Sequence, residues 1–275
     1  MICLDLDGTL LKSDKTIDEM TIKTLNDLSD EGIRVVIATG RHYDFAKQLT
    51  NSLTDDRIII SNNGAAVFEV KTNTSILTDY IDNEIAGRIV NTAKNHGLSA
   101  LVYVDVLRAG SDLFVFEGHN IDGFENTIVR DKNRIRIIAH EREIDNCFSI
   151  VFSGSTDELS KLEAAVNLEY SGKVCTHIMS SMYSQHGILE IMNQGVDKWS
   201  AISHFAEYSN IDKKSIIAFG DEVNDISMIS NSGLGIAMKN ALPEVKRVAD
   251  FITATSNDDF GVYNTLSDIF KFKEL

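Results

Sequence analysis

Cysteine is scarce in this sequence, and its positions predict no cross-link. Only Cys3, Cys147 and Cys175 occur among 275 residues. They are odd in number and far apart, and no two of them have the spacing of a metal-binding pair. A disulfide framework and a cysteine-based metal site are therefore not expected. We interpret all three cysteines as reduced, structural thiols.

Long hydrophobic runs are missing as well. The longest apolar stretches, such as residues 35–38, have the length of a β-strand rather than that of a membrane-spanning helix. Residues 1–5 include an acid and no basic region, which is not the pattern of a signal peptide. We therefore expect a cytoplasmic protein that does not have a membrane as a partner.

Positive charge is in short supply. The sequence has 26 Lys and Arg residues against 41 Asp and Glu residues, and its formal net charge is −15. Nucleic acids and anionic membranes bind through Lys and Arg side chains that neutralise phosphate groups, so neither is an expected partner. An anionic substrate would need a local source of positive charge in its site. A divalent cation could supply that charge.

Strand and helix patterns alternate at both ends of the chain. Strand-like runs at residues 2–6, 33–38 and 58–60 alternate with helical spacing at 17–28 and 42–53. Near the C-terminus, strand-like runs at 215–219, 235–238 and 251–252 alternate with helical stretches at 200–207, 225–230 and 241–248. The only proline, Pro243, falls in the first turn of the last of these helices, where a missing N–H costs least. This alternation predicts an α/β fold, with a Rossmann-like parallel sheet of buried strands.

The middle of the chain has a different pattern. Strand-like runs follow one another there and are interrupted by two helical stretches, at 83–96 and 158–170. Such an order is typical of an open, largely antiparallel sheet with helices, hence of an α+β domain. We therefore expect a core domain built from residues 1–80 and 186–275, with an inserted domain at residues 81–185.

Acidic side chains follow two of the predicted core strands. Asp5 and Asp7 come directly after the first strand, in a turn that contains Gly8, and Asp221 and Asp225 follow the strand at 215–219. The carboxyl ends of parallel strands lie at one edge of a sheet, so the two acidic groups can converge there. Carboxylates that close repel one another unless a cation lies between them. Oxygen ligands without nearby His or Cys favour Mg²⁺ over zinc.

Other polar residues also stand at the predicted strand ends. Thr39 and Gly40 offer a hydroxyl and main-chain amides that suit a phosphate oxygen, and Arg41 either contacts a ligand or braces the acidic edge. Asn63 precedes a glycine, which is a common turn signal, but its place after the third strand also makes it a possible substrate-facing residue. Lys198 opens a predicted helix, and by residue type alone it reads as an ordinary surface lysine.

Five segments of the chain, in order, carry a resemblance to a known family. The segments DLDGTL, ATGR, NNGA, GVDK and GDEVNDISMI resemble the motifs of the haloacid dehalogenase (HAD) superfamily, and in particular its Cof-type phosphatases. That group has a large α+β cap domain inserted between the second and third motifs. The similarity covers nearly all of the chain outside residues 80–185. Within that region only the order of the elements matches.

The resemblance implies a role for each residue of these motifs. Asp5 would be the nucleophile, and Asp7 would be the general acid that protonates the leaving alcohol and then activates water. Four residues would bind the phosphate or position its ligands: Thr39, Gly40, Lys198 and Asn224. Mg²⁺ would be held by Asp5, by the main-chain carbonyl of Asp7 and by Asp221, with Asp225 in support.

The expected function is therefore a Mg²⁺-dependent phosphatase that acts on a small phosphorylated metabolite through an aspartyl-phosphate intermediate. Two alternatives stay open at this point. A phosphomutase or other phosphotransferase would form the same intermediate and pass the phosphate to another alcohol, and a non-catalytic sensor would only bind a phosphorylated ligand. The residues name no particular substrate, and no residue pattern assigns an oligomeric state.

Overall fold

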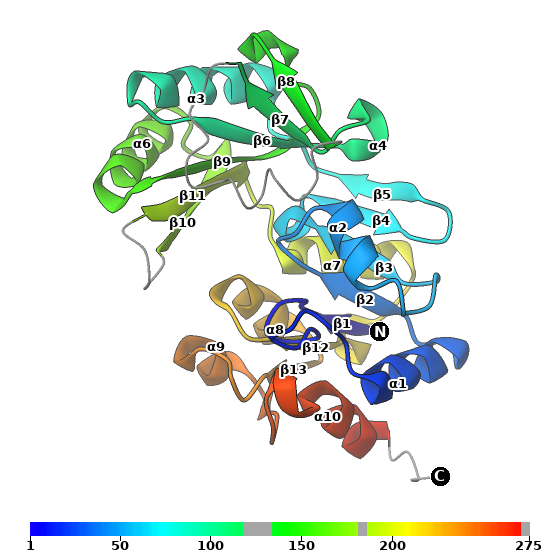
Figure 1. The fold of residues 1–275 in the computed structure, drawn as a ribbon. Helices are drawn as coiled ribbons and strands as arrows, with labels where there is room; N and C mark the ends of the chain where they lie inside the picture. Colours follow the sequence, from blue (N-terminus) through cyan, green and yellow to red (C-terminus); the bar gives the residue numbers. More distant parts are fainter. Residues whose placement is uncertain (118–133, 181–185, 271–275) are drawn as a thin grey trace. The chain divides into compact units, whose positions relative to one another are not determined.

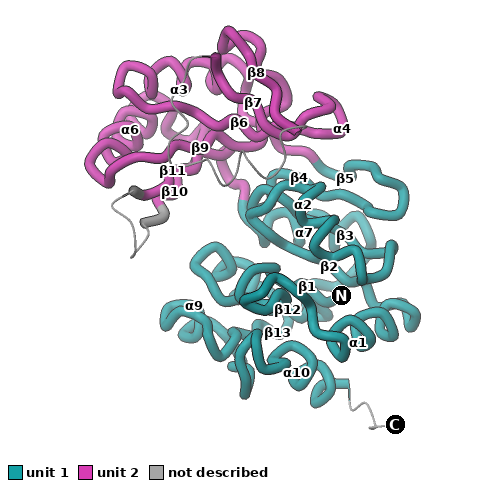
Figure 2. Tube along the Cα trace, in the orientation of Figure 1, with its two compact units in different colours: residues 1–77, 197–275 teal, residues 78–196 magenta. Residues whose placement is uncertain are grey.

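The chain divides into two compact units (Figure 2). The computed structural model describes residues 1–117, 134–180 and 186–270. Unit 1 comprises Met1–Leu77 and Asp197–Leu275, and unit 2 comprises Thr78–Val196. The second border was expected between residues 185 and 186, and residue 185 lies outside the described residues. The observed border lies between Val196 and Asp197. The segment 186–196 belongs to unit 2 because its strand β11 (His186–Asn193) pairs with two strands of that unit.

Unit 1 is built on a single sheet with the strand order β14-β13-β12-β1-β2-β3-β4-β5 (Figure 1). Its strands are β1 (Ile2–Leu4), β2 (Val35–Ala38), β3 (Ile58–Ser61), β4 (Ala66–Glu69), β5 (Thr74–Thr78), β12 (Ile217–Gly220), β13 (Leu234–Ala237) and β14 (Phe251–Ile252). Every pairing from β14 to β3 is parallel, and β4 adds to β3 in the antiparallel direction. The central strands are apolar and fully buried, as expected for strands that are covered on both faces.

Helices flank this sheet and begin and end where the sequence supplies the appropriate caps. They are α1 (Glu19–Asp30), α2 (Tyr43–Leu49), α7 (Lys198–Tyr208), α8 (Ile226–Asn231), α9 (Pro243–Val248) and α10 (Gly261–Phe270), with short 3₁₀ turns η1 (Asn62–Gly64), η4 (Lys213–Ser215), η5 (Val223–Asp225) and η6 (Asn257–Asp259). The Asp18 carboxylate caps α1 by accepting a hydrogen bond from the Thr21 N–H. Pro243 occupies the first turn of α9, as predicted. Helix α1 packs against α10, and α8 packs against both α7 and α9.

The sheet confirms the α/β fold class, and it also corrects two details. The hairpin of β4 and β5 was not predicted, so the sheet is parallel only up to β3. The run 251–252 was expected to be a buried strand, but Phe251 is 50% exposed and Ile252 is 44% exposed. Strand β14 lies at the edge of the sheet and is covered less than the central strands.

Unit 2 has a sheet of its own, with the order β10-β11-β9-β6-β7-β8. Besides β11, its elements are β6 (Ala100–Val104), β7 (Leu113–Phe116), β8 (Ile135–Ile138), β9 (Cys147–Ser155), β10 (Val174–Ser180), α3 (Asn83–Asn95), α4 (Val106–Ala109), α6 (Thr156–Glu169) and the short turn η3 (Glu141–Glu143). All the pairings are antiparallel except that of β7 with β8. The apolar faces of α3 and α6 bury Ile89 and Leu162 with strand residues such as Phe152 in one core. The observed architecture of this unit is thus α+β.

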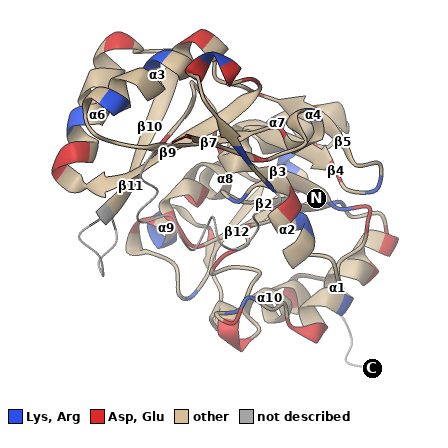
Figure 3. Cartoon of the chain, turned by 45° about the horizontal axis from the view of Figure 1, so that its top comes forward, with Lys and Arg blue, Asp and Glu red and all other residues tan. Residues whose placement is uncertain are grey.

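The structure also locates the cysteines and the charged residues. Cys3 and Cys147 are free, and the Cys175 Sγ donates to the Asn193 carbonyl at 3.3 Å. Acidic residues are spread over helices of both units and are interspersed with fewer basic ones (Figure 3). Within the described part of the chain, no helix combines the length and the apolarity needed to cross a membrane.

Candidate active site

The register of the central strands brings the two acidic segments together. Strand β1 pairs with β12 in parallel, with Leu4 opposite Phe219, and the Asp5 N–H continues the pairing by donating to the Phe219 carbonyl at 3.0 Å. Asp5 and Asp221 therefore leave neighbouring strands at the same edge of the sheet. This is the edge where open α/β sheets bind their ligands.

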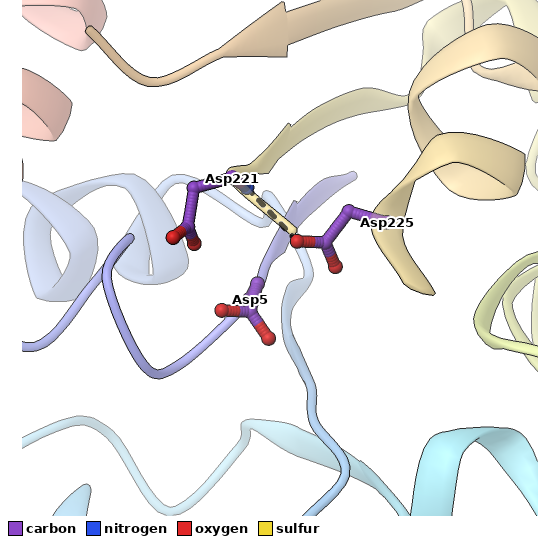
Figure 4. A group of neighbouring side chains, drawn as sticks. All are labelled: Asp5, Asp221 and Asp225. Atoms are coloured by element: carbon purple, nitrogen blue, oxygen red, sulfur yellow. Dashed lines mark hydrogen bonds between the residues drawn. The ribbon is translucent and has the colours of Figure 1, made fainter. Parts of the chain in front are cut away.

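Three buried carboxylates meet at this edge: Asp5, Asp221 and Asp225 (Figure 4). One oxygen from each lies within 4.8 Å of the others. Burial is the main cause that raises the pKa of Asp5 well above its ordinary value, and the charge of Asp225 adds to it. Burial also raises the pKa of Asp221 to about 7, although a hydrogen bond from Thr9 acts in the opposite direction.

Lys198 is the cation that faces this cluster. Its Nζ donates to Asp5 Oδ1 and to Asp225 Oδ1, at 2.6 Å in each case, and the residue is only 1% exposed. Its reading as an ordinary surface lysine is thus wrong. Burial alone would lower the pKa of Lys198, but the charges of Asp225 and Asp5 outweigh it and raise the pKa, so the ammonium stays charged.

The start of helix α7 reaches the cluster because another loop allows close packing. Gly64 has a φ of 111°, and a Cβ on it would lie 2.1 Å from the carbonyl oxygen of Asp197. Only a glycine therefore permits the loop after β3 to lie against the residue that caps α7. This contact, between segments distant in sequence, is part of what encloses Lys198.

Asp225 supports the cluster rather than facing it with free oxygens. Its Oδ1 accepts from Lys198, and its Oδ2 accepts from the main-chain N–H groups of Asp221 and Glu222 at 2.9 and 3.0 Å. These contacts fix the turn that presents Asp221. In this cluster, the negative charges of three carboxylates face the positive charge of one ammonium group, that of Lys198. The all-oxygen donor set and this excess of buried negative charge fit a hard divalent cation.

The Asp7 carboxylate binds two other cations, Arg41 and Lys15. Arg41 binds its carboxylate in a two-pronged contact, with Nη2 2.7 Å from Oδ1, and Lys15 Nζ lies 2.7 Å from the same Oδ1. Burial would raise the pKa of Asp7, but the hydrogen bonds from Arg41 and Lys15 outweigh it and hold the pKa below its ordinary value. The Arg41 guanidinium also stacks on the Phe45 ring, 4.7 Å from its centroid. Arg41 thus braces an acid in this structure, and its contact with a substrate stays a prediction.

The remaining predicted residues join the ends of β2, β3 and β12. Thr39 is buried, its hydroxyl oxygen accepts from the Arg41 N–H at 3.1 Å, and its carbonyl accepts from the Asn63 N–H at 3.0 Å. Asn224 Nδ2 donates to Asn63 Oδ1 at 2.9 Å. Gly40 follows Thr39 and is exposed. Asn63 therefore links two phosphate-binding candidates. Its N–H donates to Thr39, and its side-chain oxygen accepts from Asn224.

Comparison with known proteins places the chain in a family. A family model described as haloacid dehalogenase-like hydrolase matches residues 2–266. The chain belongs to the haloacid dehalogenase-like hydrolases. All of the described strands of both units fall within the matched residues.

Similar proteins match most of the chain. The 5-amino-6-(5-phospho-D-ribitylamino)uracil phosphatase YitU of Bacillus subtilis is 29% identical, with 98% of this chain and 97% of the relative covered. An HMP-PP phosphatase of Serratia proteamaculans is 26% identical, over 90% of this chain and 86% of its own. A crystal structure of a haloacid dehalogenase-like hydrolase from Bacteroides thetaiotaomicron has 29% identity and a TM-score of 0.82, with 98% of each chain covered.

The structure also adds site residues that the sequence reasoning missed. In this HAD protein, Thr9 donates from its hydroxyl to Asp221 Oδ1 at 2.7 Å, in a buried contact. The position of Thr9 inside the DLDGTL segment was a signal for it. Lys15 carried no such signal, because a lysine in a polar loop is ordinary. Its contact with Asp7 becomes visible only in three dimensions.

Proposed function

We propose that the protein is a magnesium-dependent phosphatase that hydrolyses phosphate esters of small metabolites through an aspartyl-phosphate intermediate. The observation that carries this proposal is the buried Asp5 carboxylate, paired with Lys198 at 2.6 Å and gathered with two further carboxylates. Two of the relatives are named as phosphatases, which supports the same reaction class.

In the first step, the Asp5 carboxylate attacks phosphorus, and the bond from phosphorus to the ester oxygen breaks. The leaving oxygen takes a proton from Asp7, and phosphate remains as an acyl phosphate on Asp5. In the second step, water attacks that phosphorus while Asp7 takes its proton, and the bond to Asp5 breaks to release inorganic phosphate. Covalent catalysis thus divides one difficult displacement into two easier ones.

The surrounding residues supply the charge that phosphoryl transfer requires. The Lys198 ammonium and the Thr39 hydroxyl would hold the equatorial oxygens of the phosphoryl group, where negative charge is concentrated. Asp5, Asp221 and the main-chain carbonyl of Asp7 would hold Mg²⁺, and Asp225 would support them. When bound, the ion neutralises charge on the phosphoryl group. In the structure, Arg41 and Lys15 hold Asp7 as a carboxylate, which is the form that accepts the proton from water in the second step. To act as the acid of the first step, Asp7 must leave these contacts and take up a proton before the leaving oxygen departs.

We further propose that unit 2 is the cap domain of the enzyme. It is inserted in the chain between Thr39, in the first segment of unit 1, and Lys198, at the start of the second. The substrate is a small phosphorylated metabolite, such as a sugar phosphate or an intermediate of vitamin biosynthesis. The relatives' names, a phosphoribitylaminouracil phosphatase and an HMP-PP phosphatase, favour this class.

The test is phosphate release from a panel of phosphorylated metabolites, with Mg²⁺ and with a chelator in its place. We expect release that requires Mg²⁺ and that is abolished by Asp5→Asn. Asp258→Asn is the matched control, because it alters an exposed acid of the same unit that binds Ser13 and belongs to no proposed ligand set. Phosphate transfer to an added alcohol without net release would indicate a phosphotransferase. Binding of a phosphorylated ligand without any turnover would indicate a sensor.

A further inference from the structure

Two loops distant in sequence donate hydrogen bonds to the backbone of residues 8–11, directly after Asp7. Asn240, which follows β13, donates from Nδ2 to the Gly8 carbonyl at 2.7 Å. Asn257, which follows β14, donates from Nδ2 to the Leu11 carbonyl at 2.9 Å. The two asparagines are themselves joined, because the Asn257 N–H donates to Asn240 Oδ1 at 3.1 Å. We call Asn240 and Asn257 the asparagine clasp.

The chemistry of Asn240 suits this place closely. Its side chain donates to one carbonyl and accepts from one N–H, so both ends of the amide are used. An aspartate would present an acceptor to the Gly8 carbonyl, and an alanine would reach neither partner. The side chain is exposed, and its contacts lie on the loop backbone rather than in a hydrophobic core. Its contribution is therefore to position the loop.

The backbone held by Asn240 lies directly against a proposed ligand of the cation. Gly8 has a φ of 78°, and a Cβ on it would lie 2.2 Å from Asp221 Oδ2. The next residue, Thr9, donates to Asp221 Oδ1 at 2.7 Å. The preceding carbonyl, that of Asp7, is a further proposed ligand. A shift of Gly8 therefore moves two ligands, and a cation site tolerates displacements of only about 0.2 Å.

We propose that Asn240 is a positioning residue of the cation site, and that it acts by holding the Gly8 carbonyl. The inference rests on the cation site of the proposed function and adds a residue to which the family resemblance assigns no role. Partners that orient metal ligands typically change metal affinity by about 10–100-fold when they are removed. We expect an effect near the lower end, because Asn240 touches the ligand loop and not a ligand itself.

The test is calorimetric titration of Mg²⁺ into the full-length protein and its variants. For Asn240→Ala we expect a dissociation constant raised about 10-fold over the unsubstituted protein. Asn257→Ala, which leaves Asn240 in contact with Gly8 but removes the support at Leu11, is expected to give a smaller increase. Urea denaturation of each variant confirms that it is folded. If Asn240→Ala is not folded, Asn240→Ser decides the matter, because its shorter side chain cannot span the Gly8 carbonyl and the Asn257 N–H.

Asn26→Ala is the matched control. Asn26 bridges two backbone groups in the same manner, donating to the Ser52 carbonyl at 3.3 Å and accepting from the Thr54 N–H at 2.8 Å, but neither group belongs to a proposed ligand loop. Its Mg²⁺ affinity should equal that of the unsubstituted protein. Equal affinity in Asn240→Ala and Asn26→Ala would overturn the proposal, and so would a wild-type protein that binds no Mg²⁺.

Binding and turnover separate this inference from the proposed function. A protein that binds Mg²⁺ and loses affinity in Asn240→Ala supports the inference even if no ester is hydrolysed. A protein that hydrolyses esters but keeps its affinity in Asn240→Ala contradicts the inference and leaves the phosphatase standing.

Discussion

At the scale of the residue, Lys198 shows what the sequence alone conceals. A lysine that opens a helix is usually solvated, but here α7 begins against the loop after β3 and Lys198 is a buried partner of two acids. The family resemblance assigned it to phosphate binding, but its pairing with Asp5 and Asp225 was not predicted and is visible only in the structure. The pairing of Asp7 with Lys15 was not predicted either.

Replacing Lys198 with methionine should destabilise the fold. Breaking a buried ion pair by removing one partner typically costs about 3–5 kcal/mol in the free energy of unfolding, because it leaves uncompensated charge. The loss should shrink toward acidic pH, since the pKa of Asp5 is already raised and its protonation removes one of the two unpaired charges. Urea denaturation near neutral and acidic pH measures both effects.

Lys71→Met is the control for that measurement. Its ammonium pairs with Asp56 at 2.8 Å, but both side chains are exposed, so solvent already screens the pair. We expect a clearly smaller change than for Lys198→Met. Equal losses in the two variants would contradict the buried ion pair at the site.

Asp221 should make the effect of Mg²⁺ depend on pH. Its pKa in the folded protein is raised to about 7 from an ordinary 3.8, so its contribution to stability is fully present below the ordinary value and is lost as pH rises through about 7. A cation that binds the ionised carboxylate offsets this loss. The increase in Tm on adding Mg²⁺ should therefore be larger at about pH 8 than at about pH 5, where protons compete for the ligands. A larger increase at the acidic pH would contradict this reading of the site.

At the scale of the element, the turn after β1 depends on a close approach. Gly32 and Gly8 both have a left-handed φ, of 88° and 78°, but nothing lies within 4 Å of a Cβ on Gly32, whereas a Cβ on Gly8 collides with Asp221. Gly32→Ala should cost about 1–2 kcal/mol from the backbone conformation alone. Gly8→Ala should cost at least about 1 kcal/mol more because of the collision, and it should weaken Mg²⁺ binding. Urea denaturation and Mg²⁺ titration of the pair provide the measurement, and equal stability of the two variants would contradict the close packing.

Most elements could be predicted because their sequence patterns are strong. The β-branched runs of β2 and β3 and the apolar spacing of α1 gave the correct type of structure. Helix α2 was expected to end at residue 53 but ends at Leu49. The buried Arg57 guanidinium donates to the carbonyls of Lys47 and Leu53, so these groups are satisfied without a further helical turn. That guanidinium comes from outside the helix, so the helical pattern could not show it.

The hairpin of β4 and β5 shows the same limit in a sheet. The residues of β5 are mostly polar and partly exposed, and their pattern is weak. What fixes β4 is its antiparallel pairing with β3, in which Ile59 lies opposite Phe68. Pairing with a neighbour, rather than local propensity, decides strands of this kind.

At the scale of the whole molecule, the site is assembled from segments at opposite ends of the sequence. The parallel order of the central strands made it possible to predict that Asp5 and Asp221 converge, because β1 and β12 end at one edge. The asparagine clasp could not be predicted in this way, since it depends on how loops 232 residues apart are placed, from Gly8 to Asn240. With a net charge of −15, the chain also relies on a few local cations to receive an anionic substrate.

The most direct test of the proposed mechanism is to trap the covalent intermediate. The protein is mixed with Mg²⁺ and a hydrolysable phosphate ester, quenched rapidly in acid, digested and analysed by mass spectrometry. We predict a phosphoryl group on the peptide that contains Asp5, and more of it in Asp7→Asn with an ester of a good leaving group, because that variant lacks the base for the second step. Steady release of phosphate with no phosphoryl group on Asp5 would contradict the account, since it would mean that water attacks the ester directly.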